Sequence, residues 1–182
     1  DTSGSGLNKR GYRLAQGEAP IKETLAASLI RLANWKGDSP LIDPFCGTGT
    51  IAIEACLIAQ NIAPGFNRDF VSEEWNIMPP NIYDELRDEA DRMADYDKEI
   101  EVYASDIDPE MVEIAKRNAE EVGLGDIIQF NVKDVNTLTI DSEGPVALVG
   151  NPPYGERIGD REEVEEMYRY IGSLMKQHPY LS

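Results

Sequence analysis

The sequence predicts an α/β fold in which a mostly parallel sheet carries helices on both faces. Two observations support this prediction. Short apolar runs alternate along the chain with segments of helical periodicity, and the first apolar run ends at a glycine-rich turn that leads into a helix. The 182 residues, 41% of them hydrophobic, suffice for one well-buried core and are too few for two domains of ordinary size.

The first third of the chain is expected to run from a loop into helix, strand, turn and helix. Residues 1–20 contain four glycines and no steady period, which indicates a loop or a short strand. A helix is predicted over 21–34 from the helical spacing of Ile21, Leu25, Leu29 and Leu32. The apolar run 40–43 predicts a strand, and the Ala- and Ile-rich segment 51–60 predicts the helix after the glycine turn.

Residues 61–98 are predicted to be an insertion between the first and second strands. Prolines and glycine over 61–81 indicate irregular structure, and the acidic segment 82–97 predicts an exposed helix. Such an insertion either covers a site or is a surface excursion packed by its own aromatic side chains, which are Phe66, Phe70 and Trp75.

The alternation of strand and helix returns after the insertion. Strands are expected over 99–105, 127–132 and 146–149, and helices over 109–122 and 161–177. The helical spacing predicts that the first of these helices turns Met111, Ile114, Ala115 and Val122 inward. In the second helix it places one apolar face on Val164, Met167, Ile171, Leu174 and Met175.

Charge argues against non-specific binding of nucleic acid by this chain as a whole. The formal net charge is −17, whereas phosphate contacts need clustered lysine and arginine. The charge is uneven, however, because basic residues gather in the first 36 positions. Lys9, Arg10 and Arg13 are therefore candidates for contact with a substrate phosphate, and a solvated basic loop is the alternative interpretation.

Composition also excludes several classes of protein. No apolar run is long enough to span a bilayer and the polar residues 1–6 do not resemble a signal peptide, so a cytoplasmic location is expected. Cys46 and Cys56 lie ten residues apart and far from the single histidine, His178, which argues against a zinc site and against a disulfide framework. We expect no bound metal.

The glycine turn is the first candidate site, because ligands of open parallel sheets bind beyond the carboxyl ends of the strands. Gly47 and Gly49 allow a tight turn and close approach of a ligand, and the following helix offers free N–H groups. A dinucleotide-binding pattern would place glycine where Ala52 stands, which weakens a dehydrogenase interpretation without excluding it. The candidate residues of this turn are Asp43, Pro44, Phe45, Cys46, Gly47, Thr48 and Gly49.

Carboxylates after the next two strands are the second and third candidates. Asp106 could accept both hydroxyls of a ribose, with Ile107 beside it, whereas Asp108 before Pro109 is a typical helix N-cap and is assigned to structure. Asp134 could accept from the amino group of an adenine, and an ordinary turn aspartate is an equally good interpretation.

The segment after the fourth strand offers the most specific chemistry. The side-chain oxygen of Asn151 and the carbonyl of Pro152 could accept the two N–H groups of a planar amine, while Tyr154 stacks on its ring. Pro152 and Pro153 restrict the loop to one shape. Such an arrangement would turn the lone pair of a nucleobase amine toward a methyl donor.

These motifs resemble those of class I S-adenosylmethionine-dependent methyltransferases that modify amino groups. The motifs are Asp43–Thr50, Ser105–Asp108, Lys133–Asp134 and Asn151–Tyr154. Three further segments are similar to the THUMP-associated ribosomal RNA guanine-N2 methyltransferases, whose members are also labelled N6-adenine-specific DNA methylases: Leu7–Arg13, Glu18–Leu25 and Ile62–Arg68. The resemblance covers essentially the whole chain.

The resemblance implies a Rossmann-like methyltransferase domain over 39–182, preceded by a lead-in and helix over 1–38. It further implies that residues 43–49 bind S-adenosylmethionine, that Asp106 holds its ribose and Asp134 its adenine, and that the catalytic group is Asn151, Pro152, Pro153 and Tyr154. Members of the family carry a THUMP domain and about three further strands, so we expect this chain to lack its last strands and the main RNA-binding parts.

Four functions stay open at this point, and the weakest is a dehydrogenase, which the Asn-Pro-Pro-Tyr segment and the lack of an evident hydride-transfer acid or base disfavour. The first is methylation of guanine N2 in ribosomal RNA, and the second is N6-adenine methylation of DNA, because the same acceptors serve both amines. The third is a cofactor-binding module without catalysis, which the acidic composition favours. Only the family-like flanking segments favour RNA.

Overall fold

A computed structural model describes residues 4–13, 20–153 and 161–181, and its centre is a four-stranded parallel sheet. The strands are β1 (Leu41–Asp43), β2 (Val102–Asp106), β3 (Ile128–Val132) and β4 (Ala147–Leu148), arranged in the order β3-β2-β1-β4. Leu41 lies beside Val102 on one side and beside Ala147 on the other. The strand order therefore reverses at β1, and β1 contributes the glycine turn.

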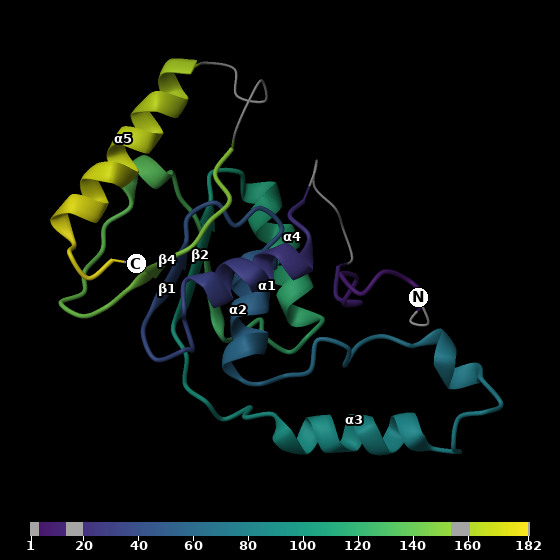
Figure 1. The fold of residues 1–182 in the computed structure, drawn as a ribbon. Helices are drawn as coiled ribbons and strands as arrows, with labels where there is room; N and C mark the ends of the chain where they lie inside the picture. The colour runs from purple at the N-terminus through teal and green to yellow at the C-terminus, as the bar shows by residue number, and fades with distance from the viewer. Residues whose placement is uncertain (1–3, 14–19, 154–160, 182) are drawn as a thin grey trace.

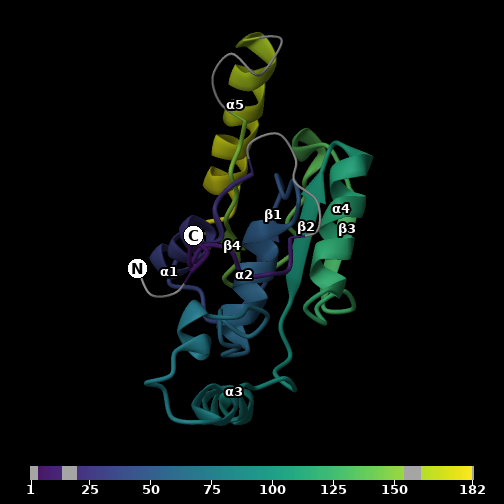
Figure 2. The ribbon, with the colours of Figure 1, turned by 90° about the vertical axis from the view of Figure 1, so that its right-hand side faces the viewer.

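Helices cover both faces of the sheet, as expected from the alternation in sequence. Figure 1 shows one group of helices on one side and the last helix on the other, and Figure 2 shows the first group from the front. The first group is α1 (Glu23–Leu32), α2 (Thr50–Ala59) and α4 (Pro109–Glu120), and the last helix is α5 (Arg161–Gln177). The α/β architecture with a parallel sheet is confirmed.

The buried face of α1 differs from the predicted apolar face. Leu25 and Leu32 are 53% and 81% exposed, whereas Glu23, Ala26 and Ile30 are buried. The reason is that α1 packs along α2 through this face, and the carboxylate of Glu23 is buried there with Arg13 as its ion-pair partner. A charged residue that is paired can lie in a core where an apolar pattern would place a leucine.

Smaller differences occur in α4 and α5. In α4 the buried apolar residues are Val112, Ala115 and Ala119, so the inward face is rotated relative to the predicted one and Met111 is only half-buried. In α5 Met167 and Leu174 are buried as predicted, but Met175 is 51% exposed. In both helices only part of the predicted apolar face is fully buried.

The insertion contains a short 3-10 helix, η1 (Val71–Glu74), and α3 (Ile82–Met93), which ends four residues before the predicted helix end at position 97. No residue of α3 is buried. Of the three aromatic residues expected to pack the insertion, Phe70 stacks on Tyr83 with ring centroids 5.9 Å apart, whereas Phe66 and Trp75 are 46% and 39% exposed.

Candidate functional site

The loops after β1, β2, β3 and β4 surround one cavity of about 670 Å³ at the carboxyl ends of the strands. It lies where the strand order reverses, which is the position at which open α/β sheets bind ligands. Sequence-predicted residues that line it are Pro44, Phe45, Cys46, Gly47, Thr48, Asp106, Ile107, Asp134, Asn151 and Pro153. The described residues of the insertion, 61–98, line no part of it, so the idea that the insertion covers this site is wrong.

The glycine turn has the backbone that its sequence predicted. Gly47 and Gly49 have φ angles of 49° and 83°, in the left-handed region that favours glycine. A Cβ on Gly49 would lie 3.0 Å from the Cβ of Ala115 on α4, whereas a Cβ on Gly47 would meet no atom within 4 Å. The absence of a side chain at Gly49 therefore allows α2 and α4 to lie close to each other. At Gly47 it leaves open space on the side of the cavity.

Asp106 ties the glycine turn to the end of β2. Its Oδ2 accepts from the backbone N–H of Gly47 at 2.9 Å, and its Oδ1 accepts from the N–H of Asp108 at 3.0 Å. A carboxylate oxygen can accept more than one hydrogen bond, so both oxygens can still serve a ligand in the cavity. Asp108 caps α4 by accepting from Glu110 N at 2.8 Å, which confirms its structural assignment.

Asp134 has the two features that the sequence left as alternatives. Its Oδ1 accepts from the N–H of Asn136 at 2.9 Å and thereby caps the 3-10 helix η2 (Val135–Thr137). It also lines the cavity together with Lys133 and Asn136. The turn role is confirmed, and the turn places the carboxylate at the rim of the site.

Asp43 lies beneath the cavity and not in its lining, which differs from its expected place in the ligand-contacting turn. Its side chain is fully buried, Oδ1 accepts from Phe45 N at 3.1 Å, and Oδ2 has no partner among the described residues. Burial raises the pKa of this carboxyl to about 8, a shift that the Phe45 N–H opposes and Asp106 reinforces. Asp43 therefore acts as part of the floor that holds the turn.

The loop after β4 reaches the same cavity through Asn151 and Pro153, with Pro152 half-buried between them. Tyr154, which was expected to stack on the substrate ring, lies outside the described residues. Gly150, which the sequence reasoning missed, brings this loop close to the glycine turn, because a Cβ there would lie 3.2 Å from Phe45 and 3.3 Å from Asp43. The signal in the sequence that could have identified Gly150 was its position directly before the Asn-Pro-Pro segment.

Asn118 on α4 is a second residue that sequence reasoning missed. It is buried, and its Nδ2 donates to the carbonyl of Thr48 at 3.0 Å. A buried backbone carbonyl without a partner is costly, so this bond stabilises the glycine turn from below. A polar residue on the otherwise apolar inward face of the helix was the signal in the sequence.

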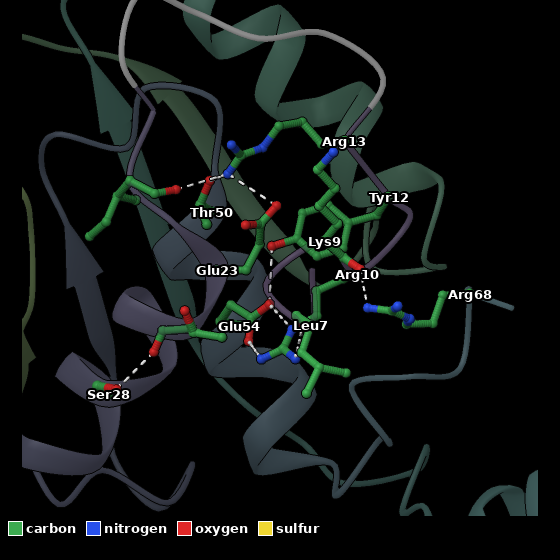
Figure 3. A network of polar contacts seen from close by, with 12 residues as sticks. Leu7, Lys9, Arg10, Tyr12, Arg13, Glu23, Ser28, Thr50, Glu54 and Arg68 are labelled. Atoms are coloured by element: carbon green, nitrogen blue, oxygen red, sulfur yellow. Dashed lines mark hydrogen bonds and ion pairs between the residues drawn. The ribbon is translucent and has the colours of Figure 1, made fainter. Parts of the chain in front are cut away.

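Two of the three basic N-terminal residues, Arg10 and Arg13, are internal. For these two, both substrate-phosphate contact and a solvated basic loop are contradicted. Figure 3 shows Arg10 and Arg13 pointing toward carboxylates of α1 and α2. Arg10 pairs with Glu54 at 3.3 Å and Arg13 pairs with Glu23 at 3.4 Å, and each arginine side chain is 13% exposed. Neither guanidinium is free for a substrate phosphate or surrounded by water, and only Lys9 remains exposed.

Metal ligation and thiol chemistry find no support in the described residues. No group of three or more His, Cys, Asp or Glu side chains among residues 4–13, 20–153 and 161–181 is placed to hold a metal ion. Cys46 and Cys56 are free and buried, and burial raises the pKa of both thiols. In the same part of the chain, no helix combines the length and the apolar character needed to cross a bilayer.

This fold and cavity define a Rossmann-like domain of the kind that binds a nucleoside cofactor at a strand-order reversal. A family model described as the RMKL-like methyltransferase domain matches residues 10–180. The chain therefore belongs to the RMKL-like methyltransferase domain family. The class I methyltransferase fold expected from the motifs is confirmed.

Curated relatives match nearly the whole chain. "Putative RNA methyltransferase YpsC" of Bacillus subtilis (strain 168) is 59% identical over 176 residues, which are 97% of this chain and 46% of that protein. "Ribosomal RNA large subunit methyltransferase K/L" of Shewanella baltica (strain OS155 / ATCC BAA-1091) is 43% identical over 180 residues, covering 96% of this chain and 25% of that protein. The chain thus spans about half the length of the first relative and a quarter of the second.

Solved structures agree with the fold over the full chain. A "predicted N6-adenine-specific DNA methylase" from Listeria monocytogenes superposes with a TM-score of 0.93 at 52% identity, covering 100% of this chain and 47% of that one. SMU.472, "a putative methyltransferase complexed with SAH", superposes with a TM-score of 0.92 at 44% identity, with coverage of 100% and 47%.

Proposed function

We propose that this chain is the cofactor-binding and catalytic part of an S-adenosylmethionine-dependent methyltransferase that acts on guanine N2 in ribosomal RNA. One observation carries the proposal: residues expected on the cofactor side and on the amine side line the same cavity, with Gly47 and Asp106 on one side and Asn151 on the other. The names of YpsC and of the K/L methyltransferase support RNA as substrate, and SMU.472 complexed with SAH supports the cofactor.

The residues of the cavity fit S-adenosylmethionine. The open space beside Gly47 admits a ligand against the turn backbone, and Asp106 presents a carboxylate with remaining acceptor capacity for ribose hydroxyls. Asp134 at the rim is an acceptor suited to an adenine amino group. When bound, the cofactor supplies an electrophilic methyl group. The described residues would hold and orient the cofactor through hydrogen bonds and through the shape of the cavity.

The amine side of the cavity would act by positioning. The side-chain oxygen of Asn151 and the carbonyl of Pro152 are acceptors that would bind the two N–H groups of guanine N2 and direct its lone pair. Gly150 holds this loop against the glycine turn, so the two halves of the site are fixed relative to each other. Tyr154 would stack on the base. No covalent intermediate with the protein is needed, since positioning and electrostatics suffice for direct transfer.

N6-adenine methylation of DNA is a second candidate. The Listeria monocytogenes structure, at 52% identity, is described as a "predicted N6-adenine-specific DNA methylase", and the two acceptors at Asn151 and Pro152 suit either exocyclic amine. A net charge of −17 disfavours tight binding of either nucleic acid by this chain alone. We therefore expect RNA affinity to depend on sequence beyond these 182 residues.

The test is to identify the methylated nucleoside. The complete protein is incubated with S-adenosylmethionine and, separately, with unmodified ribosomal RNA and with DNA, and the digested products are analysed by mass spectrometry. N2-methylguanosine from the RNA is the expected result. N6-methyldeoxyadenosine from the DNA would replace the leading proposal with the second candidate. Cofactor binding without any methylated product would favour a non-catalytic module.

A further inference from the structure

Arg10 and Arg13 form two buried ion pairs that are closely matched in their chemistry. Arg10 contacts both carboxylate oxygens of Glu54 on α2, at 3.3 and 3.4 Å, and Arg13 contacts Oε1 of Glu23 on α1 at 3.4 Å. The two arginine side chains are equally exposed, at 13%, and the carboxylates are 2% and 5% exposed. The pairs differ in what else each guanidinium contacts, and Glu54 also accepts from the hydroxyl of Tyr12 at 3.1 Å.

Arg13 reaches the wall of the cavity, whereas Arg10 does not. The Nη2 of Arg13 donates to the carbonyl of Ile21 and to the hydroxyl of Thr50, each at 2.9 Å. Ile21 and Thr50 both line the 670 Å³ cavity, and Thr50 is the first residue of α2 after the glycine turn. Besides Glu54, the Arg10 side chain donates to the carbonyl of Leu7, and neither Leu7 nor Glu54 lines that cavity.

Figure 3 shows how the Arg13 guanidinium lies between α1 and the start of α2, with its bonds directed to both. One nitrogen thus joins two wall segments that are about thirty positions apart in sequence. The pairing is incomplete, because Arg13 Nε and Glu23 Oε2 have no hydrogen-bond partner among the described residues. Buried ion pairs of this kind contribute little net stability, and their best-supported role is to fix one arrangement of packed elements.

We propose that Arg13 is a positioning residue of the cofactor cavity. It holds the wall formed by Pro20 and Ile21 against Thr50 at the N-terminus of α2, so that the cavity has its binding shape before the cofactor arrives. Preorganisation of this kind raises affinity because the ordering cost is not incurred on binding. The proposal rests on the proposed function, in which this cavity binds S-adenosylmethionine. Arg13 acts through its neighbours and not on the reacting methyl group.

The experiment compares Arg13→Met with the matched control Arg10→Met in the complete protein. Methionine keeps an unbranched apolar stem and removes the guanidinium, so each variant leaves one buried glutamate without its arginine. Thermal unfolding without ligand and isothermal titration with S-adenosylmethionine are measured for both. We expect both variants to unfold at lower temperature and only Arg13→Met to raise the Kd, by about tenfold or more.

Thr50→Val tests the same contact with a smaller change that leaves both Arg–Glu pairs in place. If Arg13 acts through Thr50, the Kd of the double variant Arg13→Met/Thr50→Val is close to that of the weaker-binding single variant. Arg13→Lys, which keeps a charge for Glu23, serves if Arg13→Met does not fold, and it is expected to raise the Kd less.

Four results would overturn the inference. Equal effects of Arg13→Met and Arg10→Met on the Kd would show that only global destabilisation is measured. Fully additive effects of Arg13→Met and Thr50→Val would show that Arg13 does not act through Thr50. If the wild-type protein has no measurable affinity for S-adenosylmethionine, the proposed function is overturned together with this inference. If the wild type binds S-adenosylmethionine and Arg13→Met binds it with the same Kd, the inference alone is overturned.

Discussion

Replacement of Asp43 by asparagine should make the stability of the protein less sensitive to pH. The carboxyl is fully buried below the glycine turn, and one of its oxygens has no hydrogen-bond partner among the described residues. Burial raises its pKa from an ordinary value of 3.8 to about 8. In the folded protein the group therefore keeps its proton through most of the neutral range, whereas in the unfolded chain it is ionised above about pH 4.

The direction of the effect follows from proton binding. Between pH 4 and 8 the folded state binds more protons at Asp43 than the unfolded state, so the wild-type free energy of unfolding falls as pH rises through this window. The slope is roughly 1.4 kcal/mol per pH unit, and the sum over the window is about 6 kcal/mol as an upper limit. Asparagine has nearly the same shape and cannot ionise, and its oxygen can still accept from Phe45 N.

The assay is urea unfolding of wild type and Asp43→Asn at intervals from pH 4.5 to 8.5. The stability of the variant relative to wild type should increase steadily with pH and level off above about pH 8. The control is Asp141→Asn, which makes the same substitution at an exposed position. A constant difference for Asp43→Asn would refute the reasoning, because it would show that Asp43 binds the same number of protons in both states.

Three further substitutions test the geometry of the site. Gly49→Ala should lower the free energy of unfolding by about 1–2 kcal/mol because of the left-handed backbone, and further because the new Cβ would lie 3.0 Å from Ala115. A variant as stable in urea as the wild type would contradict this. Gly150→Ala should lower turnover, by up to roughly a hundredfold, more than it lowers cofactor affinity, and steady-state kinetics with unchanged turnover would contradict the close approach of the two loops. Asn118→Leu should destabilise by about 1–3 kcal/mol through the unpaired carbonyl of Thr48, and equal urea midpoints would argue against that bond.

The order and type of the elements could be predicted because local patterns determine them. The strand before Asp43, the turn with glycines at 47 and 49, and the helix that starts at Thr50 follow from apolar runs and from backbone angles that only glycine adopts easily. Asp108 and Pro109 likewise mark a helix start through local chemistry. Helix ends differed by a few residues, as at Met93, where the pattern of charges continues but the helix does not.

Long-range pairing explains most of what the sequence did not reveal. Glu54 and Glu23 are buried only because arginines from the N-terminal segment reach them, in the first case across 44 positions of sequence. No local pattern indicates such partners, so Arg10 and Arg13 were interpreted as surface residues. Asp43 was assigned to the ligand for the same reason, since its position beneath the turn depends on how the loop at Gly150 packs over it.

The central claim, that one cavity joins a cofactor side to an amine side, is tested most directly by replacing Asn151. In Asn151→Ala, methyl transfer by the complete protein should fall by about 10²–10³-fold, while the Kd for S-adenosylmethionine stays within about twofold of wild type. Asn136→Ala is the matched control, because Asn136 is also an exposed asparagine that lines the cavity but lies beside Asp134, and it should leave turnover largely unchanged. Equal turnover in Asn151→Ala and wild type would contradict the account.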